Sequence, residues 1–282
     1  MKINVATVDS GWILQKIAEK VCSSRPDTFS LSHAPRHDVD ANFYIDVQNC
    51  YQGKTKTIDI GFFTHLHEDS PKYLSPHWLQ LDHIVHMCSR YFNTFSSYYP
   101  KEKMSMMMPG EFSPNFQPKK QTIGIFQRGA HEGKGFHFMK KMADKDIIKQ
   151  FKFLFIGKDW EEAIELFRKN GAQVSSREDE LYETYPGLYS KIDYLLIPSL
   201  WEAGPMSAIE ALSCGIPIIS SNVGWMGIDL KPEYLFNPNS DIELELILNN
   251  IFSKIKDRVD QVKDLSYKTY SEKIIKIIES IK

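Results

Sequence analysis

Two glutamates stand in a stretch of the chain that favours a tight loop followed by a helix. Glu202 lies in a short polar loop after the apolar run 194–197, and Glu210 falls within the helix expected next. Pro205 suits the first position of that helix, because its ring fixes φ and the N–H that it lacks would be unpaired there anyway. The free N–H groups at a helix start attract an anion. Carboxylates beside an anion can accept hydrogen bonds from neutral hydroxyls, so the stretch suits a nucleotide sugar.

A second stretch supplies positive charge. Arg128 and Lys134 offer cationic groups for phosphate, and the glycines around them let the backbone approach a ligand closely. A P-loop is the alternative interpretation. It fails because the spacing from Gly129 to Gly133 is too short, and because Gly135 replaces the Ser or Thr that binds Mg²⁺.

Together these stretches resemble the donor site of the retaining glycosyltransferases of family 4 (glycosyl transferases group 1), which have the GT-B fold. The run 198–217 is similar to the family's Glu-x7-Glu signature, and the run 125–135 resembles its Gly-Arg…Glu-Lys-Gly segment. Gln127 departs from the glycine that the family often has, which predicts a narrower pocket. The alternative is an ordinary βαβ connection with two solvent-exposed glutamates, but the order of strand, loop, helix and strand favours the family.

The resemblance implies roles for individual residues. Arg128 and Lys134 are expected to hold the donor diphosphate and to steady the leaving group. Glu202 is expected to accept hydrogen bonds from the sugar hydroxyls, and Glu210 from the ribose. The full set of expected donor-binding residues is Gly11, Arg128, Lys134, Gly157, Lys158, Glu202, Ala203, Gly204, Pro205, Met206 and Glu210. For Lys158 a plain strand end is the alternative.

A histidine-containing segment, 61–69, resembles the family's strand-end Thr/His segment, whose histidine faces the donor sugar. His65 and His67 compete for that role, so the expected catalytic residues are Glu202, His65, His67, Lys134 and Arg128. Alternating histidines can share one face of a strand, and a metal site of His65, His67, Glu68 and Asp69 is therefore the alternative. Because cationic side chains neutralise the phosphates in such a site, we expect no metal and no cofactor besides the nucleotide-diphosphate sugar itself.

Composition and charge bear on the partners and the location of the protein, and they make nucleic acid an unfavoured partner without excluding it. The chain has 282 residues, 42% of them hydrophobic and 25% charged, and its formal net charge of −2 creates no field that recruits nucleic acid. Four cysteines form no C-x-x-C pair, which favours reduced thiols. No apolar run is long enough to span a bilayer. We expect a cytoplasmic protein. A peripheral contact with the inner face of the membrane through 101–108 is the alternative to a core strand there.

Short apolar runs alternate with helical patterns, which predicts α/β architecture with parallel sheets. Strands are expected at about 2–8, 42–46, 57–62, 83–86, 122–126, 151–156, 194–197 and 216–219. The proline-rich run 109–118 predicts a hinge between two Rossmann-like domains, 1–118 and 119–264, with a cleft between them. The resemblance implies that a final helix, 265–282, crosses back to the first domain.

The resulting hypothesis is a retaining glycosyltransferase whose acceptor is a saccharide or glycoconjugate. The resemblance implies a front-face displacement in which the leaving phosphate helps to deprotonate the acceptor. A glycosidase also uses two carboxylates, but the cationic phosphate site argues against it. A nucleotide-sugar epimerase of the same fold and a non-catalytic nucleotide-sugar-binding protein stay open as alternatives.

Overall fold

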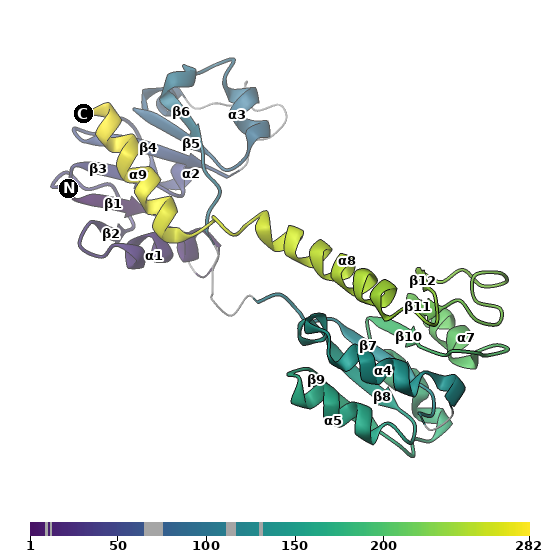
Figure 1. The fold of residues 1–282 in the computed structure, drawn as a ribbon. Coiled ribbons are helices and arrows are strands. Elements are labelled where there is room, and N and C mark those ends of the chain that lie inside the picture. Colours follow the sequence, from purple (N-terminus) through teal and green to yellow (C-terminus); the bar gives the residue numbers. More distant parts are fainter. Residues whose placement is uncertain (9–10, 12, 65–75, 111–116, 130–131) are drawn as a thin grey trace. The chain divides into compact units, whose positions relative to one another are not determined.

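The computed structural model divides into two compact units (Figure 1). It describes residues 1–8, 11, 13–64, 76–110, 117–129 and 132–282. Unit 1 contains Met1–Gln117 and Asp260–Lys282, and unit 2 contains Pro118–Val259. The boundary expected from the sequence, after residue 118, lies next to this division. Most of the expected hinge, at 111–116, lies outside the described residues.

Unit 1 contains a parallel sheet in the order β2-β1-β3-β4-β5-β6. Its strands are β1 (Ile3–Ala6), β2 (Phe29–Ser32), β3 (Ala41–Tyr44), β4 (Ile58–Phe63), β5 (His83–His86) and β6 (Met104–Met106). Its helices are α1 (Ile13–Ser24), α2 (Val47–Cys50), α3 (Ser89–Phe95) and α9 (Tyr267–Ile281), with 3₁₀ turns at Pro76–Gln80 and Lys101–Lys103. The sequence did not predict β2, because this strand lies at the sheet edge and only its first residue is buried.

The C-terminal helix α9 belongs to unit 1 and packs against α1 (Figure 1). Its residues Tyr270 and Ile274 are buried in one cluster with Ile17 of α1. The hydroxyls of Ser24 in α1 and of the buried Ser271 in α9 share a hydrogen bond of 2.6 Å. The last helix therefore completes the core of the unit that contains the N-terminus.

Unit 2 contains a parallel sheet in the order β12-β11-β10-β7-β8-β9. Its strands are β7 (Thr122–Phe126), β8 (Lys152–Ile156), β9 (Gln173–Arg177), β10 (Tyr194–Ile197), β11 (Ile218–Ser221) and β12 (Tyr234–Phe236). Its helices are α4 (Phe136–Ala143), α5 (Glu161–Lys169), α6 (Tyr185–Tyr189), α7 (Met206–Ser213) and α8 (Asp241–Asp260), with 3₁₀ turns at Glu132–Lys134, Asp146–Gln150 and Tyr182–Thr184. When its strands are numbered from the start of the unit, this sheet has the strand order of the Rossmann fold. The chain adds β8 and β9 on one side of β7 and then continues with β10 on the other side, so the strand order reverses between β7 and β10.

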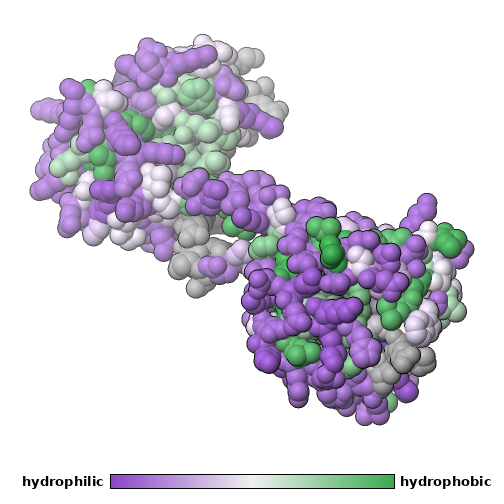
Figure 2. Space-filling model, viewed as in Figure 1, coloured by the Kyte–Doolittle hydropathy of each residue, from purple (hydrophilic) through white to green (hydrophobic). Residues whose placement is uncertain are grey.

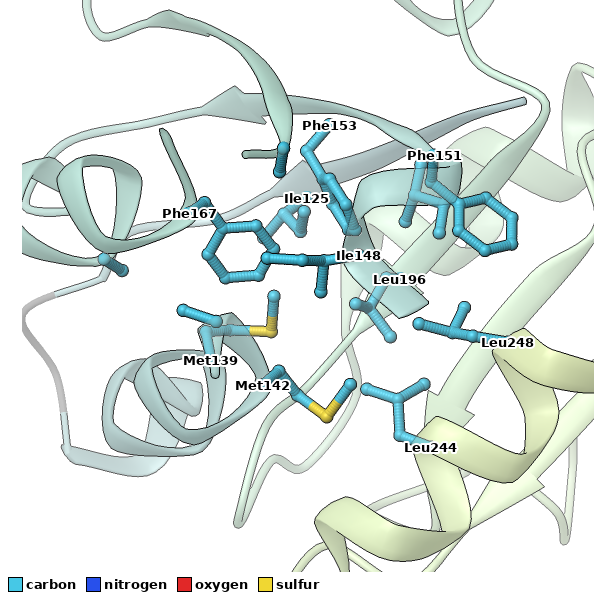
Figure 3. Packing of buried hydrophobic residues seen from close by; sticks show 14 of the residues in the cluster. Ile125, Met139, Met142, Ile148, Phe151, Phe153, Phe167, Leu196, Leu244 and Leu248 are labelled. Carbon is cyan, nitrogen blue, oxygen red and sulfur yellow. The ribbon is translucent and has the colours of Figure 1, made fainter. Parts of the chain in front are cut away.

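The core of unit 2 forms where helices cover the sheet. Met139 and Met142 of α4 lie in one buried cluster with Phe153 of β8 and Leu244 of α8 (Figure 3). The strands β9 and β12 were not predicted. Most of β9 is exposed and lacks an apolar run, and β12 is only 3 residues long.

The predicted fold class, two Rossmann-like units of parallel sheet flanked by helices, is confirmed. The cleft between the units stays a prediction. None of the helices that the structure describes has both the length and the apolar character needed to cross a bilayer. Hydrophilic side chains cover much of the visible face of each unit (Figure 2).

Two smaller expectations concern cysteines and methionines. All four cysteines are free thiols. In the segment 101–108, Met104 and Met107 are buried, as a core strand requires, whereas Met106 and Met108 are exposed. A membrane contact at this segment stays a prediction.

Candidate active site

A pocket of about 490 Å³ opens in unit 2 where the strand order reverses. Ligands of open α/β sheets bind at this position, beyond the carboxyl ends of the strands. The lining comes from the end of β7, the loop after β10, the start of α7 and the segment around α6. It consists of Phe126, Gln127, Arg128, Lys134, Tyr182, Tyr185, Glu202, Gly204, Pro205, Met206, Ser207 and Glu210.

Most of the residues singled out in the sequence meet in this pocket. The lining includes Arg128, Lys134, Glu202, Gly204, Pro205, Met206 and Glu210. Three others from unit 2 do not line it: Gly157, Lys158 and Ala203. Gly11 belongs to unit 1, and His65 and His67 lie outside the described residues. The structure thus groups the two expected cations with the two expected carboxylates, and their roles in binding and catalysis stay predictions.

Lys134 is held at the pocket by contacts of its own loop. Gly135 has φ +81°, and a Cβ there would lie 2.0 Å from the carbonyl oxygen of Pro198, so only glycine allows this approach. The amide group of Gln127 donates to the carbonyl oxygen of Lys134 at 2.6 Å, and its oxygen accepts from the Ser199 hydroxyl at 3.3 Å. Gln127 therefore lines the pocket and also ties the cationic loop to the loop after β10.

The side chains of Lys134 and Glu202 form an ion pair in which Lys134 Nζ contacts Glu202 Oε2. The exposed fractions are 30% for Lys134 and 17% for Glu202, so water screens the pair only in part. Arg128 is exposed, and among the residues that the structure describes it has no ion-pair partner. One cation is therefore already paired with a carboxylate, and the other is open to an incoming anion.

The start of α7 forms another wall of the pocket. Pro205 was predicted as the first helical residue, but its ψ of 111° is extended, so it caps the helix and Met206 is the first helical residue. Gly204 lies against the ring of Trp225, where a Cβ would be 2.4 Å from the nearest ring atom. The backbone N–H groups at the start of α7 and the positive end of its dipole thus border the same pocket as Arg128.

Glu210, on α7, is half-buried and accepts two hydrogen bonds from tyrosines. The Tyr182 hydroxyl donates to Oε1 at 2.8 Å, and the Tyr189 hydroxyl donates to Oε2 at 2.7 Å. The pKa of Tyr189 is raised mainly by burial and next by the bond to Glu210. The pKa of Tyr182 is raised mainly by its bond to Glu210. Both tyrosines therefore remain protonated donors at neutral pH.

Tyr182, Tyr185 and Tyr189 were not predicted as site residues. Their i, i+3, i+7 spacing is the pattern of one face of a helix, and it was the available signal. Tyr182 and Tyr185 line the pocket with ring centroids 5.4 Å apart. Phe126 stacks on Tyr189 with centroids 4.4 Å apart. Aromatic rings therefore form the wall next to Glu210.

The expected donor-binding residues outside the pocket have other contacts. Gly157 has φ +119°, and a Cβ there would lie 2.5 Å from the carbonyl oxygen of Gln127, so this glycine supports the loop that carries Arg128. Lys158 Nζ pairs with Asp179 at 2.7 Å on an exposed surface. The carbonyl oxygen of Ala203 packs against Gly224 instead of lining the pocket.

In unit 1, the backbone N–H of Gly11 donates to the side chain of Gln15 in α1. No group of three or more His, Cys, Asp or Glu side chains suited to a metal ion occurs among the described residues. The alternative metal site at 65–69 lies outside them, so it is not tested.

The pocket lies within a segment that matches a known protein family. Residues 111–273, more than half of the chain, match the family model described as glycosyl transferases group 1. The chain belongs to this family. The membership confirms the predicted family.

Two curated proteins share shorter segments with this family member. The UDP-Gal:alpha-D-GlcNAc-diphosphoundecaprenol alpha-1,3-galactosyltransferase of Escherichia coli is 30% identical over 102 residues, covering 28% of this chain and 26% of the relative. Protein CapJ of Staphylococcus aureus is 33% identical over 67 residues, covering 23% of this chain and 17% of CapJ. The matches thus span about a quarter or less of each relative's own length.

Among solved structures, Anabaena HepE in complex with UDP and glucose is similar over the full chain. It has 13% sequence identity and a TM-score of 0.42, and the match covers 100% of this chain and 98% of HepE.

Proposed function

We propose that the protein transfers a sugar, with retention of anomeric configuration, from a nucleotide-diphosphate sugar to a hydroxyl of a saccharide or glycoconjugate. The observation that carries this proposal is the composition of the unit 2 pocket. It brings the cations Arg128 and Lys134, the start of α7 and the carboxylates Glu202 and Glu210 to the switch point of a Rossmann sheet. Family membership supports the same reaction class.

In this proposal the diphosphate binds between the cations and the start of α7. Arg128 and Lys134 donate charge-assisted hydrogen bonds, and the backbone N–H groups at the start of α7 complete the anion site. Negative charge grows on the leaving phosphate as its bond to the anomeric carbon breaks. Cations fixed in place before the reaction stabilise that charge more than they stabilise the ground state.

Glu202 orients the sugar in this arrangement. Its Oε2 contacts Lys134, which leaves Oε1 to accept hydrogen bonds from sugar hydroxyls. The ion pair also sets the distance between the cation at the phosphate and the carboxylate at the sugar, so the donor is held in one orientation. A front-face displacement, in which the leaving phosphate takes the acceptor proton, then needs no protein nucleophile.

The nucleoside lies toward the aromatic wall. Glu210 accepts from ribose hydroxyls, and the rings of Tyr182 and Tyr185 offer apolar faces to a base. The Escherichia coli relative is named for UDP-Gal, which makes UDP-sugars the first donors to test.

The test is incubation with a panel of labelled nucleotide sugars, with and without saccharide acceptors and with EDTA in a parallel series. A glycosylated product identified by mass spectrometry, with its anomeric configuration read by NMR, supports the proposal. Conversion of one nucleotide sugar into another identifies an epimerase instead. Binding by calorimetry without transfer or slow hydrolysis identifies a non-catalytic binding protein, and loss of activity in EDTA contradicts a metal-independent reaction.

A further inference from the structure

The carboxylate of Glu210 accepts hydrogen bonds from two tyrosines that differ in exposure. Tyr189 donates to one oxygen and is 1% exposed, and Tyr182 donates to the other and is 65% exposed. One bond therefore comes from inside the unit and the other from its solvent side.

The inner tyrosine is fixed by its packing. The Tyr189 ring stacks on Phe126 with centroids 4.4 Å apart and an interplanar angle of 16°, and both side chains belong to one buried cluster with Leu195 of β10. A hydroxyl on such a ring cannot leave the carboxylate without disturbing the core. Its bond therefore sets the rotamer of Glu210 before any ligand arrives.

The outer tyrosine has no such restraint. Tyr182 lies in a 3₁₀ turn, and its ring meets only the neighbouring Tyr185 ring at 5.4 Å among the ring contacts of the described residues. Its hydroxyl donates to Glu210 Oε1, and both residues line the pocket, so a ligand hydroxyl that bonds this oxygen would have to share it with Tyr182. A carboxylate has about four acceptor positions, but the positions that face the pocket are the ones that Tyr182 and a ligand would share.

We propose that Tyr189 is a positioning residue that presents the Glu210 carboxylate to the ribose hydroxyls of the donor, and that Tyr182 competes with the ribose for that carboxylate. This inference rests on the proposed function. It predicts opposite effects of removing the two hydroxyls. Without the Tyr189 hydroxyl, Glu210 loses its orientation and selects less strongly for a ribose diol. Without the Tyr182 hydroxyl, the ribose meets no competitor.

The experiment is calorimetric titration of the full chain with UDP, ADP and GDP, each compared with its 2′,3′-dideoxy counterpart. For the wild-type protein we expect at least one ribonucleotide to bind about tenfold more tightly than its dideoxy counterpart, the effect of one hydrogen bond to a charged group. Tyr189→Phe should reduce that ratio to about threefold or less while the dideoxy Kd changes less than about twofold. Tyr182→Phe should tighten ribonucleotide binding by about two- to fivefold.

Tyr194→Phe is the matched control. Tyr194 lies at the start of β10, outside the pocket lining, and among the described residues its hydroxyl has no hydrogen-bond partner, so the ratio should not change. An unchanged ratio in Tyr189→Phe, or equal weakening of both nucleotides as a purely structural role predicts, overturns the inference. If Tyr189→Phe does not fold, Tyr182→Phe still decides, because weaker ribonucleotide binding overturns the competition.

The same titrations distinguish a failure of the proposed function from a failure of this inference alone. If the wild-type protein binds none of the nucleotides, both the function and this inference are wrong. If it binds ribonucleotides selectively and the tyrosine variants behave like the control, only the inference is wrong.

Discussion

Lys134 and Glu202, which lie 68 positions apart in the sequence, form an ion pair at the wall of the unit 2 pocket. Each residue was predicted for a different part of the donor, the phosphate for Lys134 and the sugar for Glu202. Their contact means that neither side chain acts alone: a substitution at Lys134 also frees Glu202. Experiments on this site therefore need controls that separate charge from orientation.

The first prediction concerns leaving-group stabilisation. Lys134→Ala should lower kcat for sugar transfer by about 10²- to 10³-fold, because removing one preformed donor at a developing charge has an effect of this size. Lys152→Ala is the matched control. Lys152 is the first residue of β8, at the end of the strand away from the pocket, so this substitution should leave kcat unchanged. Steady-state kinetics checks both. Turnover that is equal in the two variants contradicts the assignment.

The second prediction concerns the exposed cation. Arg128→Ala should weaken nucleoside diphosphate binding by about ten- to a hundredfold, the effect of a lost charge-assisted hydrogen bond. Binding of the corresponding nucleoside, which has no phosphate, should be the same in the variant and the wild-type protein. Calorimetry at low salt measures both ligands. If nucleoside binding falls equally, Arg128 contacts the nucleoside and not the phosphates.

The third prediction concerns the backbone that carries Lys134. Gly135→Ala should reduce the free energy of unfolding by about 2 kcal/mol or more, because the new Cβ collides with a backbone carbonyl at a φ of +81°. Gly187→Ala, in α6, has open space around the new Cβ and should be neutral or slightly stabilising. Thermal unfolding followed by circular dichroism compares the two. A Gly135→Ala variant as stable as Gly187→Ala would show that the two loops are not in close contact.

The fourth prediction concerns pH. Burial, and next the neighbouring His83, lowers the pKa of His86 from 6.5 to about 4. Among the residues that the structure describes, neither ring nitrogen of His86 has a hydrogen-bond partner. Below pH 6.5 the unfolded chain takes up a proton that the folded chain does not bind until about pH 4. The free energy of unfolding therefore loses nothing to this ring above pH 6.5 and decreases as the pH falls below that value. At pH 5 the loss from this ring is roughly 2 kcal/mol.

Replacing the ring tests this pH effect. His86→Phe should unfold at a higher denaturant concentration than the wild-type protein at pH 5, with a smaller difference at pH 7.5, since the surroundings of His86 are Phe63, Phe92 and Phe95. His137→Phe, at an exposed position, serves as the control. The prediction is wrong if the difference between His86→Phe and wild type does not grow as the pH falls.

The sequence predicted the parallel α/β architecture and most of the buried strands, because buried parallel strands are short apolar runs that can be recognised locally. The edge strands β2 and β9 were missed for the same reason, since exposed strands have no such run. Sequence motifs also identified Arg128, Lys134, Glu202 and Glu210, because each motif is contiguous and its residue types match the chemistry of phosphate and hydroxyl groups.

Only the tertiary structure decided which of these residues share a pocket and what else contacts them. It brought Tyr182 and Tyr189 to Glu210 and excluded Lys158 and Ala203 from the lining. The physical reason is that strand order and helix packing set the distances between residues far apart in the chain, and local patterns carry little information about either. Residue types thus indicated the chemistry, and the fold determined which side chains can act together.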